Sequence, residues 1–145
     1  MIHIFNRVTL FKDTLKAGIK YEHKFLVPSS KTVPALYPEA EGFLAMPEVF
    51  ATGFLEWACI KCVNPHLDWP KEQTVGTPVD MTHQAASPPG MEVKASAELI
   101  EMKGRRLVFQ VETHDGVDVI FKGWHERFII SKEKFDAKLA QKKRH

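Results

Sequence analysis

The sequence predicts an α+β fold in which a curved antiparallel sheet surrounds one long helix. The first observation is segment 48–63, which has no proline and is apolar nearly all round, as in a helix buried on most sides. The second is a series of four segments of strand character, 74–86, 91–102, 105–114 and 117–130, joined by short turns. One sheet that curls around the helix covers its apolar surface most economically.

The elements before these strands are bounded by prolines. Segment 18–27 alternates loosely and has β-branched and aromatic residues, so we expect it to be the first strand. Segment 29–47 holds several prolines and is expected to be a long loop, a kind of segment that often carries function. Pro47 suits the first turn of the helix, because its missing N–H costs nothing there, and Asn64-Pro65 ends the helix.

The second half of the chain has the pattern of an antiparallel meander. Asp115-Gly116 is a strong hairpin signal, because both positions tolerate positive φ. The order of strand, long loop, helix and four-strand meander is the hot-dog architecture, with about five strands. Because the helix is more apolar than one sheet can cover, we expect a homodimer. The strand before the hairpin alternates a packed set, Leu107, Phe109 and Val111, with a solvent-facing set, Val108, Gln110 and Glu112.

Composition and charge exclude several classes of protein. The 145 residues are 44% hydrophobic, and a formal net charge of +2 gives no reason to expect nucleic-acid binding. No run approaches the roughly 18 apolar residues of a membrane span, and the start of the chain lacks a secretory signal, so we expect a cytoplasmic protein with no membrane partner.

We divide the chain into an N-terminal extension (1–17), a hot-dog domain (18–131) and a basic C-terminal helix or tail (132–145), on which Phe135 and Leu139 form a packing stripe.

Glu56 is the anomaly within the apolar helix segment. One interpretation is a carboxylate buried away from water for acid–base or nucleophilic catalysis. The other is a carboxylate that reaches the helix surface or a structural partner. Thr52 lies one helical turn earlier on the same face, although a threonine inside a helix often only bonds back to the backbone. His83 lies in an unusually polar strand, and Gly76 in the same strand suggests the close approach of a ligand or another backbone.

Metal and redox chemistry have little support in the sequence. Cys59 and Cys62 have the CxxC spacing, but they lie near the end of the helix and not at its N-terminus, where the helix dipole lowers a thiol pKa. No further cysteine exists for a zinc site, so we interpret both as small buried hydrophobic residues. His114 and His125 match no metal-ligand spacing, and we expect neither a metal nor a cofactor.

A set of short motifs extends from the helix segment to the last predicted strand. The helix segment carries Pro47-Glu48-Val49-Phe50-Ala51-Thr52-Gly53-Phe54 and then Glu56-Trp57-Ala58-Cys59. Further motifs are Gly76-Thr77, Thr82-His83, Pro88-Pro89-Gly90, Gly104-Arg105-Arg106-Leu107, His114-Asp115-Gly116-Val117-Asp118 and His125-Glu126-Arg127. In order and spacing they resemble the fluoroacetyl-CoA thioesterase family of hot-dog proteins, over roughly residues 18–140.

The resemblance implies an enzyme that hydrolyses an acyl-CoA thioester to the free acid and CoA without a metal. It also implies a catalytic threonine, glutamate and histidine, which by motif match are Thr52, Glu56 and His83. Gly76 matches the family's glycine that meets the substrate, and Arg127 matches its substrate-side arginine. The sites would form across the homodimer, with residues from both chains.

Two positions depart from the family pattern. The family's threonine and glutamate lie about eight residues apart, whereas Thr52 and Glu56 lie four apart, a difference of one helical turn that nearly keeps the face. Phe43 matches an aromatic residue of the family's lid, but Met46 stands where another aromatic would be, so we expect a short-chain acyl-CoA substrate and no fluoroacetyl selectivity. The alternative function is a non-catalytic hot-dog module that binds an acyl thioester or a partner.

Overall fold

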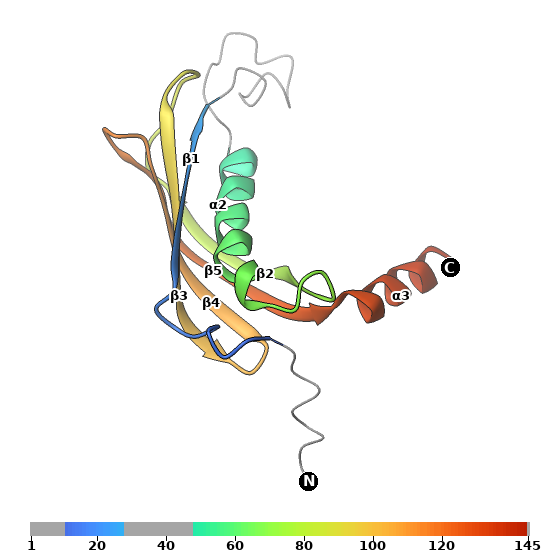
Figure 1. Ribbon diagram of the computed structural model, residues 1–145. Coiled ribbons are helices and arrows are strands. Elements are labelled where there is room, and N and C mark those ends of the chain that lie inside the picture. The colour runs from blue at the N-terminus through green and yellow to red at the C-terminus, as the bar shows by residue number, and fades with distance from the viewer. Residues whose placement is uncertain (1–10, 28–47, 145) are drawn as a thin grey trace.

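The computed structural model describes residues 11–27 and 48–144. In this part of the chain, one long helix lies against the hollow side of a curved five-stranded sheet, and a second helix follows the last strand (Figure 1). The elements in chain order are β1 (Lys20–Leu26), α2 (Glu48–Val63), the 3-10 turn η4 (Asn64–His66), β2 (Glu72–His83), β3 (Glu92–Lys103), β4 (Arg106–His114), β5 (Val119–Ser131) and α3 (Lys132–Lys143).

The order of the strands confirms the predicted hot-dog architecture. The sheet runs β1-β3-β4-β5-β2, and every neighbouring pair is antiparallel. Helix α2 packs chiefly against β3 and β1, at the hollow face of the sheet (Figure 1). The helix has the predicted bounds, and each strand begins and ends within two residues of its predicted limits, except that β2 ends three residues early.

Burial alternates along the strands as predicted, so one face of the sheet packs against α2 and the other meets solvent. Val108 is the exception: it was expected on the solvent-facing side, yet it is only 7% exposed. It pairs with Glu101 and Glu126 on the two neighbouring strands, whose long side chains flank it. The buried set includes Leu55, Ala58 and Cys59 of α2, Val93, Ala95, Ala97 and Leu99 of β3, and Leu107, Phe109 and Val111 of β4.

Apolar surface remains uncovered on the helix and on the outer strand β2. Trp57 of α2 is 42% exposed in the single chain, although it stacks edge-on against His23 of β1. In the described part of the chain, β2 is bonded to a neighbouring strand, β5, on one side only. Val79, in the middle of β2, is 44% exposed. The β2–β5 register shifts between Gly76 and Val79, so β2 is irregular near its centre.

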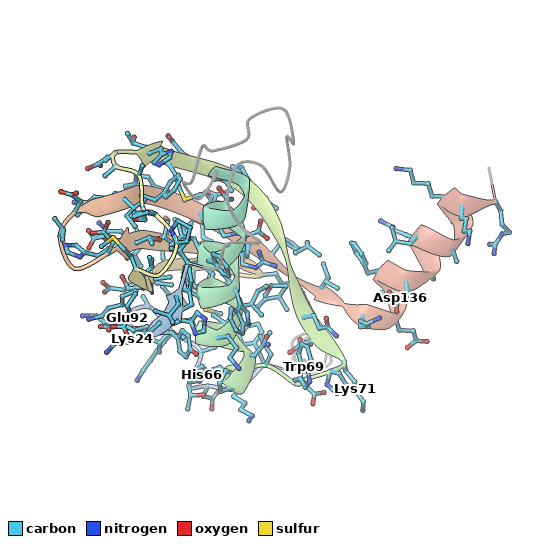
Figure 2. The ribbon with its side chains drawn as sticks, turned by 90° about the horizontal axis from the view of Figure 1, so that it is seen from above. Lys24, His66, Trp69, Lys71, Glu92 and Asp136 are labelled. Carbon is cyan, nitrogen blue, oxygen red and sulfur yellow. The ribbon has the colours of Figure 1, made fainter. Side chains whose placement is uncertain are left out.

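The two ends of the described chain behave differently. Leu15, within the predicted extension, is 4% exposed, and the Lys12 amide donates to the carbonyl of His66, so this segment is anchored at the end of α2. Helix α3 projects from the end of β5, and Asp136 on it lies far from α2 (Figure 2). No residue of α3 is buried, so the packing stripe expected on this helix does not form in the single chain. Neither α2 nor α3, the helices of the described segments, is long and apolar enough to cross a membrane.

Candidate active site

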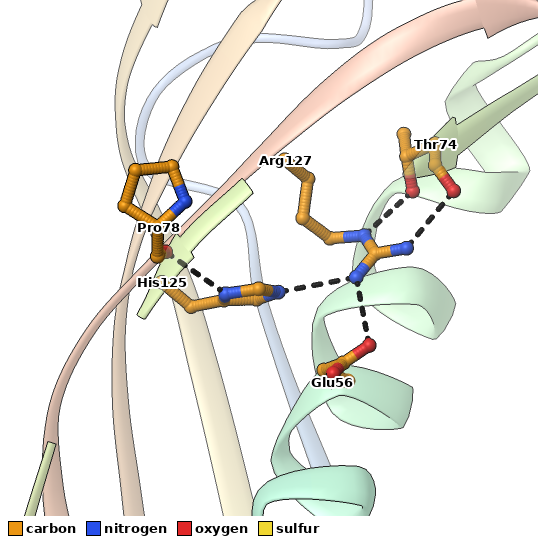
Figure 3. A network of polar contacts seen from close by, with 5 residues as sticks. All are labelled: Glu56, Thr74, Pro78, His125 and Arg127. Carbon is orange, nitrogen blue, oxygen red and sulfur yellow. Dashed lines mark hydrogen bonds and ion pairs between the residues drawn. The ribbon is translucent and has the colours of Figure 1, made fainter. Parts of the chain in front are cut away.

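The candidate site is centred on Glu56, in the middle of α2. Its Oε2 atom lies 3.3 Å from Nη1 of Arg127, which reaches across from β5 (Figure 3). The Glu56 side chain is 41% exposed, whereas the Arg127 side chain is only 4% exposed. In the single chain Glu56 is therefore not buried away from water, as one interpretation of the sequence expected. It is an ion-paired carboxylate that an approaching molecule can reach.

Arg127 is held by three contacts besides the one to Glu56. Its Nε donates to Oγ1 of Thr74 at 2.8 Å, and its Nη2 donates to the backbone carbonyl of Thr74 at 2.9 Å. Its Nη1 lies 3.1 Å from Nε2 of His125. Burial lowers the pKa of Arg127 and the charge of Glu56 opposes this shift, and a guanidinium stays protonated in proteins. Because the guanidinium is planar, these contacts fix its orientation beside Glu56.

His125 borders the network on the side opposite Thr74 (Figure 3). Its Nδ1 lies 3.4 Å from the carbonyl oxygen of Pro78, and since a carbonyl only accepts, Nδ1 carries the proton. Nε2 then has the lone pair that accepts the Nη1–H of Arg127. Burial and, second, the positive charge of Arg127 lower the pKa of His125, so the imidazole is neutral near pH 7.

Gly76 leaves an opening over this network. It pairs with Arg127 in the register of β2 and β5. A methyl group at this position would lie 3.4 Å from Nη1 of Arg127, 3.4 Å from Cε1 of His125 and 3.7 Å from Oε2 of Glu56. A larger side chain would therefore fill the space in front of the carboxylate. The structure thus brings together three of the predicted site residues, Glu56, Gly76 and Arg127.

His83 lies at the other end of β2. In the β2–β5 register Gly76 stands opposite Arg127 and His83 opposite Phe121, so about 20 Å of strand separates the two positions. The His83 ring stacks on Phe121 with centroids 4.2 Å apart, and its Nε2 lies 2.7 Å from the carbonyl oxygen of Ala85. Since that carbonyl only accepts, Nε2 carries a proton, and Nδ1 is the nitrogen that can take up another. His83 is not part of the Glu56 network within one chain.

The remaining predicted residues fall outside the network. Thr52 lies on α2 one turn before Glu56 and is half-buried, but its hydroxyl takes no part in the contacts of Figure 3. Phe43 and Met46 lie outside the described residues. Cys59 and Cys62 are buried free thiols, as predicted. Within residues 11–27 and 48–144, no three His, Cys, Asp or Glu side chains are grouped to hold a metal ion.

Sequence reasoning did not place Thr74 and His125 in the network around Arg127. A signal for His125 was present in the alternation of β5. His125 and Arg127 share the inward face of this strand with Phe121 and Ile129, all of them buried. Polar groups on a packed face need hydrogen-bond partners, so two of them in succession indicate a network. Thr74 gave no such signal, because its partner depends on the register between β2 and β5.

The first comparison concerns the fold, which is that of the hot-dog proteins. A thioesterase superfamily member from Thermus thermophilus has a TM-score of 0.82 with this chain, covering 91% of it and 96% of the other. The two sequences are 24% identical, so this likeness speaks for the fold alone.

The sequence comparisons then define the family. The family model described as fluoroacetyl-CoA-specific thioesterase matches residues 27–133. A fluoroacetyl-CoA thioesterase from Streptantibioticus cattleyicolor is 50% identical over 135 residues, which are 90% of this chain and 96% of the relative. A solved structure of a fluoroacetyl-CoA thioesterase is 45% identical, with a TM-score of 0.82 over 90% of this chain and 98% of the other. The chain belongs to the fluoroacetyl-CoA-specific thioesterase family and is thus a member of a family of thioester hydrolases.

Proposed function

We propose that this chain hydrolyses a short-chain acyl-CoA thioester to the free acid and CoA, at a site that Thr52, Glu56 and His83 form across a homodimer. The observation that carries the proposal is the accessible Glu56 carboxylate, held by the buried Arg127 beside the opening at Gly76. Family membership supports the reaction class. Structures of the related thioesterase include a threonine-to-serine mutant with acetyl-CoA and a phenylalanine-to-alanine mutant with fluoroacetate and CoA.

Glu56 is the nucleophile or the general base in this proposal. It either attacks the thioester carbonyl carbon itself, forming an anhydride that water then hydrolyses, or takes a proton from a water molecule that attacks the same carbon. In both routes the C–S bond breaks, CoA leaves as a thiolate that takes up a proton, and the acyl group leaves as a carboxylate. Backbone N–H groups near Gly76 are the candidates to stabilise the negative oxygen that forms on the way.

Arg127 serves this chemistry from the substrate side of Glu56. Its Nη1 holds one carboxylate oxygen at 3.3 Å, which orients the other oxygen. Its positive charge also lies 3.4 Å from where a methyl group on Gly76 would be, so a carbonyl oxygen that approaches Gly76 meets a positive potential. Thr52, one turn away and about 6 Å along the helix axis, would bond the same carbonyl or the Glu56 carboxylate.

His83 enters the site from a second copy of the chain in this proposal. If two copies pair antiparallel along β2 about a two-fold axis at Asp80, Gly76 of one copy stands opposite His83 of the other. His83 is three residues from Asp80, and Gly76 is four residues away, one of which is the extra residue of β2 at the register shift between Gly76 and Val79. Both positions face the α2 side of the sheet, since Gly76 faces Glu56 and His83 stacks on the buried Phe121. The Nδ1 atom of His83 is then the group that exchanges a proton with water or with the leaving thiolate.

The contacts around the opening at Gly76 bear on the size of the acyl group. A single methyl group there would already be in van der Waals contact with Arg127 and His125. These contacts support a small acyl group in front of Glu56, and we propose a short chain. Phe43 and Met46, which precede α2, are proposed to contact it.

A thiol-release assay over acetyl-, propionyl-, fluoroacetyl- and palmitoyl-CoA tests the proposal. We expect turnover of the short thioesters, and a loss of about 10²-fold or more in kcat for Glu56→Ala and for His83→Ala. Glu92→Ala is the matched control, because it removes an exposed carboxylate on the opposite side of the sheet and should leave kcat unchanged. A wild-type chain that releases no thiol from any of the four contradicts the proposal.

Mixed dimers test whether the site is shared between two chains. Neither Glu56→Ala nor His83→Ala alone retains an intact site, but a mixed dimer of the two retains one of its two sites. Unfolding and refolding the two variants together should therefore restore about one quarter of the wild-type activity, if the copies pair at random. A chain that is a monomer by sedimentation, or a mixture without activity, rules out the shared site.

The spacing of four residues between Thr52 and Glu56 favours one other candidate, a non-catalytic module that binds acyl thioesters. Tight binding of a non-hydrolysable acyl-CoA analogue without any thiol release would support this second function.

A further inference from the structure

The Arg127 guanidinium has two kinds of anchor, and they act on different atoms. Thr74 takes the Nε–H at 2.8 Å and an Nη2–H at 2.9 Å, which fixes one edge of the group. The Nη1 atom has two hydrogens: one is shared with Glu56 at 3.3 Å and the other with Nε2 of His125 at 3.1 Å. His125 is therefore the only one of these anchors that bonds the same nitrogen as Glu56. This bond sets the direction of the second Nη1 hydrogen.

We propose that His125 is a positioning residue of the thioesterase site, which accepts one Nη1–H of Arg127 and thereby directs the other Nη1–H at Glu56. This inference rests on the proposed role of Glu56. His125 itself is buried, with 2% of its surface exposed, and only its Cε1 atom borders the opening at Gly76. Its proposed effect on Glu56 passes through Arg127.

The role requires a neutral imidazole with its proton on Nδ1. The carbonyl of Pro78, at the irregular centre of β2, accepts that proton and leaves Nε2 as the acceptor. A doubly protonated ring would point an N–H at the Arg127 guanidinium and break the contact. The charged groups that act on the ring are Arg127 and Glu126 from β5 and Glu56 from α2. Burial and the adjacent Arg127 favour the neutral ring, which agrees with the geometry.

Two nearly isosteric substitutions separate the two contacts of the ring. Glutamine can place its amide oxygen near the position of Nε2, so His125→Gln retains an acceptor for Arg127. Asparagine can place its amide nitrogen near the position of Nδ1, so His125→Asn retains the donor to Pro78 and loses the contact to Arg127. Each variant keeps one of the two bonds, and we expect similar thermal stability for both. Lys122→Gln, on the outward face of the same strand, is the control that should retain wild-type activity.

The kinetic test compares these variants with acetyl-CoA as substrate. We expect His125→Asn to lower kcat by about tenfold or more with little change in KM, and His125→Gln to stay within about threefold of the wild type. Equal kcat values for the wild type and His125→Asn overturn the inference. Equal losses in both variants also overturn it, because a purely structural histidine would behave in that way.

An NMR measurement decides the same question without turnover. Rotation about the Cζ–Nη bonds of Arg127, followed in protein labelled with ¹⁵N, should be slow in the wild type and in His125→Gln but fast in His125→Asn. If the wild type hydrolyses no acyl-CoA, the proposed function fails, and this measurement alone decides whether His125 positions Arg127. Equal rotation rates in the wild type and His125→Asn overturn the inference even in an active enzyme.

Discussion

Gly76→Ala tests the opening over Glu56 with the smallest possible change. The added carbon would lie 3.4 Å from Nη1 of Arg127, 3.4 Å from Cε1 of His125 and 3.7 Å from Oε2 of Glu56, which are ordinary van der Waals distances. The fold should therefore accept the methyl group. Replacing a strand glycine also removes an entropic penalty of about 0.5–1 kcal/mol. We expect the Tm to change by less than about 4 °C.

Catalysis should respond far more than stability. The methyl group occupies the space through which a thioester carbonyl would reach Glu56. A displacement of about 1 Å in a reacting group can lower the rate about 10²-fold, which corresponds to about 2.7 kcal/mol of transition-state stabilisation. We therefore expect kcat/KM for acetyl-CoA to fall about 100-fold in a continuous thiol-release assay. Wild-type kcat/KM in this variant would refute the proposed approach of the substrate.

Gly123→Ala is the matched control, with the same substitution on the neighbouring strand. There the added carbon would lie 2.1 Å from the carbonyl oxygen of Asp80 and 2.7 Å from Cα of Met81, so β2 and β5 would have to separate. We expect this variant to lose about 1–3 kcal/mol of unfolding free energy or more. If Gly76→Ala proved equally unstable, the van der Waals argument at Gly76 would be wrong.

Three further predictions concern stability and reactivity. The pKa of His125 is lower in the folded chain, so the unfolded chain takes up a proton more readily. The free energy of unfolding should therefore fall as the pH drops below about 6.5. Denaturant titrations from pH 8 to pH 5 measure this fall, which should be less steep in His125→Gln. Burial raises the pKa of Cys59, and raises that of Cys62 to about 11, so both thiols should react with an aromatic disulfide reagent only after unfolding. Deleting residues 133–145 should change the unfolding free energy by no more than about 1 kcal/mol, because α3 has no buried residue.

The outcomes that would contradict these three predictions are specific. A pH dependence identical in the wild type and His125→Gln would mean that the histidine does not titrate differently on unfolding. Stoichiometric labelling of the native protein within seconds would mean that the thiols are not buried. A collapse of stability on deletion would mean that the C-terminal helix packs against another copy.

Much of the fold was predictable because its determinants are local. Prolines bound the helix segment, and its limits Glu48–Val63 were predicted correctly. Alternation and the Asp115-Gly116 turn located the strands of the meander. Val108 was predicted to be exposed to solvent but is buried. Its shielding comes from neighbours on two other strands and not from its own segment.

The candidate site was predictable only in part, because its contacts are distant in sequence. Glu56 stood out as a carboxylate in an apolar segment, but its partner Arg127 is 71 residues away and is selected by the register of β5. That register shifts between Gly76 and Val79, beside Pro78, a residue that strands admit mainly at an edge or a bulge. His125 was considered as a metal ligand and as part of the His125-Glu126-Arg127 motif, but not as a partner of Arg127, and its tautomer depends on the carbonyl of Pro78.

The irregular centre of β2 also bears on aggregation. A long strand with one free side offers its backbone N–H and C=O groups to any extended chain. Pro78 has no N–H to offer, and the shift between Gly76 and Val79 divides the twelve-residue strand into two shorter pieces. Growth into a fibril needs an unbroken edge that repeats from one molecule to the next. The same feature that turns the Pro78 carbonyl toward His125 therefore also protects this chain against open-ended stacking.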